Sequence, residues 1–309
     1  MMHCLSLSKT KSARGDKMDI TTKYGVLADC REKTYHKDGS LASAFAHKPS
    51  MLNTTVGKLF LAHDFSSPRR KYIPSAKFNP DGSLQAANLA EQTKIQTTVG
   101  DFYCEYLTFY PSGTPCRLFH LNGKLGGYWS EQQETELASI TECQLPCGTI
   151  KAKIMTMHFY ETGEIASVTF FPGTLLSVKT SHGLIKTRIG ISFYQSGNLK
   201  SIEPAAPVKI TTPLGSISAF DTEPLGVTGD LNSLVWDQTG QLCSCKTTDA
   251  LSLNFLNGNS QKINPLHKLS LCSDDVMINI PYTVSWNEDN IYIEGAASKH
   301  AVYDRLELT

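Results

Sequence analysis

The sequence predicts an all-β protein, an extended antiparallel meander of repeated β-hairpins, open or curled, with a small C-terminal cap. Three observations support this fold class. A short glycine-centred phrase recurs along most of the chain, a second glycine phrase is interleaved with it, and most intervals between the glycines are 13–25 residues long. Such an interval has room for two short strands and their connection, and self-similarity on this scale is typical of repeat proteins.

The first phrase has an aromatic residue four positions before its glycine in all seven copies, and an aliphatic residue two positions after it in six. The copies are YHKDGSL (35–41), FNPDGSL (78–84), FYPSGTP (109–115), FHLNGKL (119–125), FYETGEI (159–165), FYQSGNL (193–199) and WDQTGQL (236–242). Because glycine preceded by Asp, Ser, Thr or Asn is typical of tight turns, each copy predicts a chain reversal. The predicted turn glycines are Gly39, Gly82, Gly113, Gly123, Gly163, Gly197 and Gly240.

The spacing within this phrase predicts a three-residue hairpin loop that ends in the glycine. The glycine is then left-handed, a conformation that is costly for residues with a Cβ. Pro80 and Pro111 fall at the first turn position, where their fixed φ fits. Such a loop places the aromatic residue opposite the aliphatic one and defines a buried face. The predicted pairs are Tyr35 with Leu41, Phe78 with Leu84, Phe159 with Ile165, Phe193 with Leu199, and Trp236 with Leu242.

The second phrase also ends in a glycine that indicates a turn. Pro146 and Pro213 lie two positions before this glycine, so the same three-residue loop is expected. The copies are LNTTVGKL (52–59), IQTTVGDF (95–102), CQLPCGTI (143–150), VKTSHGLI (178–185) and ITTPLGSI (210–217). Together the two phrases predict a continuous series of hairpins.

The phrases divide the chain into three parts. Residues 1–17 are expected to be a disordered or non-native arm, residues 18–250 the hairpin repeat domain, and residues 251–309 a C-terminal cap. Within the cap, the alternating pattern predicts a hairpin around Asn287–Asn290, and residues 296–308 fit a short helix or a last strand. A cap is expected because an open repeat sheet needs a segment that covers its edge.

The charge balance gives no electrostatic reason to expect nucleic acid or an anionic membrane as the partner. The chain has 29 Lys and Arg residues and 29 Asp and Glu residues. A secretory signal and a membrane-spanning run are both missing from the pattern, so we expect a cytoplasmic protein. Nine scattered cysteines, an odd number, suit a reducing compartment and are expected to be mostly small buried hydrophobes.

Two segments, FYQSGNLKS and FHLNGKLGGYW, resemble the MORN-repeat family, particularly its bacterial variant. The resemblance spans about residues 34–245 and is strongest at 109–129 and 191–202. It implies an elongated, curved antiparallel sheet and roles in protein interaction, membrane association or toxin–antitoxin pairing. The methyltransferase domain that accompanies MORN units in some proteins has no counterpart in this sequence.

Catalytic signatures do not stand out, and no catalytic residue is predicted. The sequence has no phosphate-binding glycine loop, no Gly-x-Ser-x-Gly elbow and no His-Glu-x-x-His. A zinc site from the pairs Cys143 with Cys147 and Cys243 with Cys245 is conceivable, but structural thiols are favoured because the spacing is not that of a zinc ribbon. The histidines next to turns, His36, His120, His158 and His182, are expected at solvated or edge positions. We therefore expect no metal and no cofactor.

Three tyrosines are the candidate binding residues. Tyr110, Tyr160 and Tyr194 each lie three positions before a turn glycine, on the sheet face opposite the phenylalanine that precedes them. Aligned hairpins would place them in a stripe that offers apolar area with polar tips to a partner. The alternative, which we favour, is that the tyrosines complete a second core.

The leading functional hypothesis is a non-enzymatic protein-interaction or scaffold module, with another protein as the partner. The sequence does not determine the oligomeric state. Two alternatives stay open. One is an enzyme whose site is assembled from residues distant in sequence, which a deep polar pocket or a Cys–His pair would favour. The other is an antitoxin-like or self-assembling structural protein.

Overall fold

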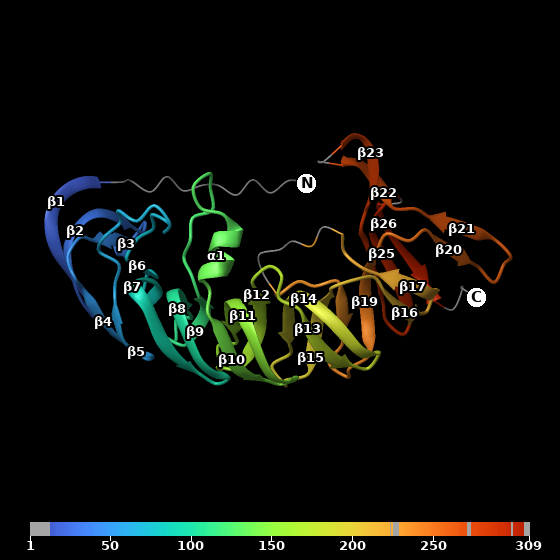
Figure 1. The fold of residues 1–309 in the computed structure, drawn as a ribbon, viewed down its shortest axis with the longest axis horizontal. Helices are drawn as coiled ribbons and strands as arrows, with labels where there is room; N and C mark the ends of the chain where they lie inside the picture. The colour runs from blue at the N-terminus through green and yellow to red at the C-terminus, as the bar shows by residue number, and fades with distance from the viewer. Residues whose placement is uncertain (1–12, 223, 225–228, 271–272, 298, 306–309) are drawn as a thin grey trace. The chain divides into compact units, whose positions relative to one another are not determined.

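The computed structural model describes residues 13–222, 224, 229–270, 273–297 and 299–305, and confirms that the chain is nearly all β. Most neighbouring strands pair antiparallel as hairpins (Figure 1), and further antiparallel pairs join strands that are not consecutive, such as β3 with β6 and β15 with β18. The chain forms two compact units. Unit 1 comprises residues 1–143 and 155–164, and unit 2 comprises residues 144–154 and 165–309. No described helix is long and apolar enough to span a membrane.

Unit 1 contains the one helix seen in the described residues. Its elements are β1 (Ala13–Thr22), β2 (Gly25–Tyr35), β3 (Leu41–Ala46), β4 (Met51–Thr54), β5 (Gly57–Phe60), β6 (Ala76–Phe78), β7 (Leu84–Thr97), β8 (Gly100–Phe109), β9 (Pro115–Phe119), α1 (Glu131–Leu137), β10 (Ile140–Leu145) and β11 (Gly148–Phe159), the last two contributing residues to both units. Strand β1 begins within the predicted arm, so residues 13–17 are part of the sheet, while residues 1–12 lie outside the described residues.

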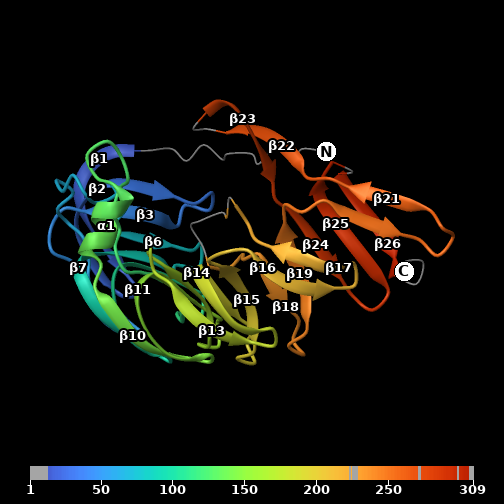
Figure 2. The ribbon, with the colours of Figure 1, turned by 45° about the vertical axis from the view of Figure 1, so that its right-hand side comes forward.

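Unit 2 continues with hairpins to the end of the described chain (Figure 2). Its strands are β12 (Ile165–Phe170), β13 (Leu176–Thr180), β14 (Gly183–Phe193), β15 (Leu199–Pro204), β16 (Val208–Thr212), β17 (Gly215–Ala219), β18 (Leu234–Trp236), β19 (Leu242–Thr247), β20 (Leu251–Asn254), β21 (Ser260–Ile263), β22 (Leu266–Ser270), β23 (Ser273–Ile280), β24 (Tyr282–Trp286), β25 (Asn290–Ala296) and β26 (Lys299–Asp304). The hairpin predicted around Asn287–Asn290 is confirmed, and the end of the chain forms strand β26 and not a helix.

The three-residue loop of the first phrase is confirmed. At Gly82, for example, the glycine N–H donates to the Asn79 carbonyl at 2.9 Å, and the glycine φ is +76°. The pairs Tyr35 with Leu41, Phe78 with Leu84, Phe193 with Leu199 and Trp236 with Leu242 lie opposite each other as predicted. For Phe159 and Ile165 the pairing stays a prediction, although Gly163 makes the expected loop hydrogen bond to Tyr160. The aromatic residues are buried except Tyr35, which is 39% exposed.

A β-bulge follows five of these loops. The strand after the turn carries one extra residue between the aromatic–aliphatic pair and the next opposed pair. A bulge bends the strand and redirects the side chain of the extra residue. The extra residues are Ala42, Gln85, Cys116, Lys200 and Cys243.

The prediction that the second phrase uses the same three-residue loop is wrong. Four of its hairpins have two-residue loops with a threonine directly opposite the glycine, as in Thr180 with Gly183. The threonine hydroxyl donates to the glycine carbonyl at 2.9 Å and accepts the N–H of His182 at 3.0 Å. The same threonine bond occurs at Thr22, Thr54, Thr97 and Thr212. These two hydrogen bonds from one threonine hydroxyl to backbone groups of the turn stabilise the two-residue loop.

The predicted turn at Gly123 is also wrong. Strand β9 ends at Phe119, and the chain then runs beside residues 69–71 toward α1. The Asn122 N–H donates to the buried Glu105 carboxylate at 2.8 Å, and a Cβ at Gly123 would overlap the Glu134 carboxylate. Distant buried partners therefore hold this segment, and a hairpin would leave them unsatisfied.

Candidate functional site

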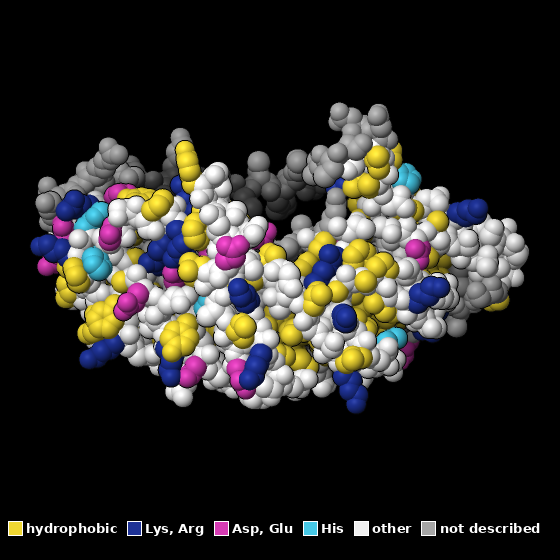
Figure 3. All heavy atoms as spheres, viewed as in Figure 1, with side chains coloured by type: hydrophobic (Ala, Val, Ile, Leu, Met, Phe, Trp, Pro, Cys, Tyr) yellow, Lys and Arg dark blue, Asp and Glu magenta, His cyan; other side chains and the backbone are white. Residues whose placement is uncertain are grey.

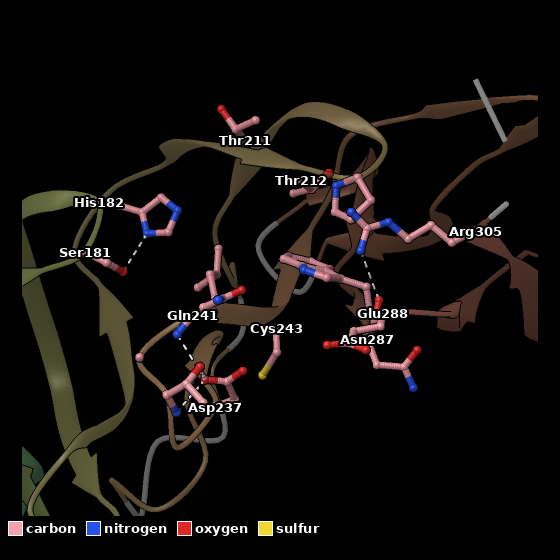
Figure 4. A pocket seen from close by; sticks show the side chains of 15 residues that line it. Ser181, His182, Thr211, Thr212, Asp237, Gln241, Cys243, Asn287, Glu288 and Arg305 are labelled. Atoms are coloured by element: carbon pink, nitrogen blue, oxygen red, sulfur yellow. Dashed lines mark hydrogen bonds between the residues drawn. The ribbon is translucent and has the colours of Figure 1, made fainter.

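Four hairpin tips of unit 2 surround an open cavity of about 780 Å³ (Figure 4). The tips are those of hairpins β13–β14, β16–β17, β18–β19 and β24–β25, and Arg305 completes the wall. The lining residues are Ser181, His182, Thr211, Thr212, Pro213, Asp237, Thr239, Gly240, Gln241, Leu242, Cys243, Trp286, Asn287, Glu288 and Arg305. We call this the tip cavity. Its lining combines both signs of charge with amide, hydroxyl and aromatic groups.

Strand pairing brings tips that are distant in sequence to the same place. Strand β19 pairs with β18 and with β24, so the loop at Asp237 and the loop at Asn287 lie on neighbouring hairpins. The bulge after Leu242 places Cys243 among the lining residues. In the view of Figure 4 the basic side chains of His182 and Arg305 lie on opposite sides of the cavity, with Cys243 between them.

Asp237, in the WDQTGQL copy of the first phrase, is ionised, and its carboxylate is hydrogen-bonded within its own turn. The Asp237 carboxylate accepts hydrogen bonds from the Thr239 hydroxyl at 2.7 Å and from the backbone N–H groups of Thr239 and Gln241. The Thr239 bond is the largest cause that holds the pKa of Asp237 below its ordinary value. A carboxylate held in this way stabilises the loop and carries a negative charge at the cavity wall.

The thiol in the tip cavity is not activated. Burial, followed by the negative charge of Asp237, raises the pKa of Cys243, and its Sγ lies 3.5 Å from the Val235 carbonyl. A nucleophilic cysteine needs a lowered pKa. The lining also contains the Gln241 amide, the Glu288 carboxylate and the guanidinium of Arg305, which donates to the Asn287 carbonyl at 3.2 Å.

A smaller cavity of about 380 Å³ adjoins the tip cavity and shares Ser181, Thr239 and Gly240 with it. Its wall includes Trp236, whose indole Nε1 donates to the Ser181 hydroxyl at 3.0 Å. The two cavities therefore lie next to each other along neighbouring hairpin tips.

The three predicted binding tyrosines are half-buried. The hydroxyl of Tyr110 donates to the Phe159 carbonyl at 2.9 Å, and that of Tyr194 donates to the Trp236 carbonyl at 2.8 Å. Each bond joins one hairpin to another, which supports a structural role for these two hydroxyls. The Lys200 ammonium also lies 5.7 Å from the Tyr194 ring centroid. Partner binding by Tyr110, Tyr160 and Tyr194 stays a prediction.

The histidines differ from one another more than the sequence suggested. His120 is fully buried, which contradicts the expected solvated position, because its Nδ1 lies 2.7 Å from the Tyr103 carbonyl. Burial lowers its pKa. His182 is exposed, as expected for a turn position, and His158 is half-buried next to Cys116.

Among the described residues no three or more His, Cys, Asp or Glu side chains gather to hold a metal ion. Of the cysteines, Cys4 and Cys272 lie outside the described residues, and four are buried in the way expected of small hydrophobes. These four are Cys30, Cys104, Cys143 and Cys245. The Lys, Arg, Asp and Glu side chains are interspersed on the face drawn in Figure 3, in line with the equal charge totals.

Sequence reasoning missed the tip cavity because its walls come from five separate segments. Asp237 and Gln241 belong to a recognised phrase, but nothing marked Trp286, Asn287 or Arg305 as their neighbours. In comparisons with known proteins, the chain matches no protein-family model, no curated protein and no solved structure. The resemblance to MORN repeats therefore stays a prediction.

Proposed function

We propose that the chain is a non-catalytic protein-interaction module, and that the tip cavity of unit 2 binds an extended segment of a partner protein. The cavity itself carries the proposal. Its volume falls within the range of roughly 300–1,000 Å³ that is usual for ligand sites. The smaller cavity next to it, which shares Ser181, Thr239 and Gly240 with it, favours a chain-like ligand that occupies both.

The lining chemistry suits a polypeptide. The Gln241 amide can donate to and accept from a peptide backbone, and Trp286 offers an aromatic surface of the type that anchors interfaces. The Asn287 amide oxygen is held by its own turn, where it accepts the N–H groups of Asp289 and Asn290 at 3.0 and 2.7 Å. Arg305 and Glu288 supply one charge of each sign at the rim, which suits a segment with both acidic and basic side chains. The raised pKa of Cys243 argues against this thiol as the nucleophile of an enzyme.

The MORN resemblance supports the same proposal, because protein interaction is one of the roles attached to that family. The rest of the support is independent of the resemblance, since it comes from the cavity and its residues. A membrane-binding role would need a basic or apolar surface, whereas the lining of this cavity is mixed in charge.

A pair of glutamine variants tests the proposal. Gln241→Trp fills the cavity, whereas Gln238→Trp makes the same substitution in the same turn at an exposed residue that does not line it. We expect a partner captured from the source cells to lose at least about tenfold in affinity with Gln241→Trp and to keep its affinity with Gln238→Trp. Equal binding to both variants would refute the proposed site.

A photo-crosslinking amino acid at either position sharpens the same test. A crosslinker at residue 241 is expected to attach to one contiguous peptide of the partner, and a crosslinker at residue 238 is expected to give little or no product. Attachment of both to the same peptide with equal yield would place the partner outside the cavity.

A further inference from the structure

Two-residue tips and three-residue loops of different hairpins touch one another in both units. The tips lie between successive strands, at β1–β2, β4–β5, β7–β8, β10–β11 and β13–β14. In the first four of these, the first tip residue contacts a turn glycine further along the chain, and we call this a tip contact. The tip contacts are Lys23 with Gly82, Thr55 with Gly113, Thr98 with Gly163, and Pro146 with Gly197.

A threonine makes two of these tip contacts in the same way. The Thr55 hydroxyl donates to the Gly113 carbonyl at 2.5 Å, and the Thr98 hydroxyl donates to the Gly163 carbonyl at 2.8 Å. The methyl group lies over the glycine, because a Cβ at Gly113 or Gly163 would be 3.2 or 3.8 Å from the threonine Cγ2. One threonine side chain therefore both satisfies the turn carbonyl and covers the turn glycine.

The tip contact is missing at Gly240. Each turn glycine meets the second tip before it in the sequence, so Gly240 corresponds to Ser181, whereas Gly39 has only one tip before it. A Cβ at Gly240 would nevertheless meet none of the described residues beyond its chain neighbours within 4 Å. The Ser181 hydroxyl accepts the indole N–H of Trp236 at 3.0 Å and lies beside His182 (Figure 4).

The smaller cavity of about 380 Å³ occupies the place of the missing contact, since both Ser181 and Gly240 line it. Leu199 and Trp236 give it apolar wall that suits a methyl group. The exposed Lys179 also lines it, and its positive charge disfavours an ammonium group like that of Lys23. A hydroxyl donor with a methyl group therefore fits this cavity best.

We propose that the smaller cavity receives a threonine side chain from the partner's extended segment, which makes the tip contact that Gly240 lacks. The threonine hydroxyl donates to the Gly240 carbonyl, and its methyl group lies over Gly240 against Leu199 and Trp236. The inference rests on the proposed function, because the same segment continues into the tip cavity. It adds a preference for one side chain that the tip cavity alone does not give.

Selection from a phage-displayed library of random dodecapeptides against the unaltered chain tests this preference. Peptides that lose affinity with Gln241→Trp are expected to share one threonine. Replacing that threonine by valine is expected to weaken binding at least about fivefold, because the Gly240 carbonyl loses its donor. Replacing it by serine is expected to weaken binding about threefold, because the methyl contact is lost.

Two variants of the chain fill the smaller cavity from opposite sides. Ser181→Lys and Lys179→Trp each place a larger side chain at an exposed residue that lines it, and each is expected to weaken peptide binding at least about tenfold. Thr98→Lys is the matched control, since it introduces the same lysine at an exposed tip residue of unit 1, and it is expected to leave peptide binding unchanged.

The outcomes separate this inference from the proposed function. Peptides that lose affinity with Gln241→Trp but bind Ser181→Lys and Lys179→Trp as well as the unaltered chain overturn the threonine site and leave the tip cavity as the binding site. Peptides that bind Gln241→Trp undiminished count against the tip cavity itself. Selected peptides without a shared threonine, or no selected peptide at all, also overturn the inference.

Discussion

Hairpins β8–β9 and β18–β19 have the same loop and the same bulge, and each places a cysteine at the bulge position. The two thiols nevertheless differ in chemistry. Burial raises the pKa of Cys116, but the pKa is lowered overall, with the hydrogen bond from His158 as the first lowering cause, whereas burial and a neighbouring carboxylate raise the pKa of Cys243. The comparison shows that the repeat determines where the cysteine lies, and that its neighbours, His158 beside Cys116 and Asp237 beside Cys243, determine the direction of its pKa shift.

Two buried glutamates extend the comparison between the units. Glu105 of unit 1 forms an ion pair with Arg69 and accepts the N–H of Asn122 at 2.8 Å. Glu203 of unit 2 accepts the N–H and hydroxyl of Ser233 at 2.9 and 2.8 Å, but its nearest cation, Arg188, lies 3.8 Å away. Each glutamate holds a segment distant in sequence by hydrogen bonds, at Asn122 for Glu105 and at Ser233 for Glu203. The two glutamates differ in how close the nearest cation lies to the carboxylate.

The largest expected effect distinguishes these two glutamates. Glu105→Gln is expected to lower the free energy of unfolding by about 3 kcal/mol, because Arg69 loses its closest counter-charge while both groups are mostly buried. Glu203→Gln is expected to leave the free energy of unfolding at pH 7 unchanged or to raise it, because the neutral amide replaces a carboxylate whose charge is penalised by burial and Arg188 keeps its hydrogen bonds to the carbonyls of Pro204 and Asp221. Urea unfolding at pH 7 measures both. Equal losses would contradict the comparison.

The second effect is the pH dependence that Glu203 imposes. Burial raises its pKa from 4.5 to about 7, so the folded state holds the proton more tightly than the unfolded state. Its contribution to stability is therefore full below about pH 4.5 and falls as the pH rises to about 7, by up to about 3 kcal/mol. Unfolding of the natural chain and of Glu203→Gln should diverge over this window, and parallel curves would count against the raised pKa.

The smallest effect concerns the charge next to Cys243. Asp237→Asn removes a negative charge that raises the pKa of the thiol and is expected to increase its alkylation rate at pH 7 by about twofold, since the carboxylate is exposed and screened. The Cys116 rate is expected to stay unchanged and serves as the control. If salt at about 0.5 M leaves the gain at Cys243 intact, the effect is not electrostatic.

Much of the local structure was predictable. The turn at Gly82 and the pairing of Phe78 with Leu84 follow from the glycine spacing, because a left-handed residue and a closing pair are local requirements. Helix α1 had a signal that went unused, the capping box of Ser130 and Gln133. The false turn at Gly123 shows the limit of the pattern, since the buried carboxylates of Glu105 and Glu134 outweigh the local turn preference there.

The sequence by itself determined the all-β class, the positions of most chain reversals and the register of the strands that flank them, because these depend on residues fewer than eight positions apart. Only the tertiary structure decided which tips surround the cavity of unit 2 and which side chains reach Cys116. His158 lies 42 positions from Cys116, and Arg305 lies 68 positions from Asp237. The physical reason is that hydrogen bonds and charges act through space, whereas a repeated phrase describes only the residues within one hairpin.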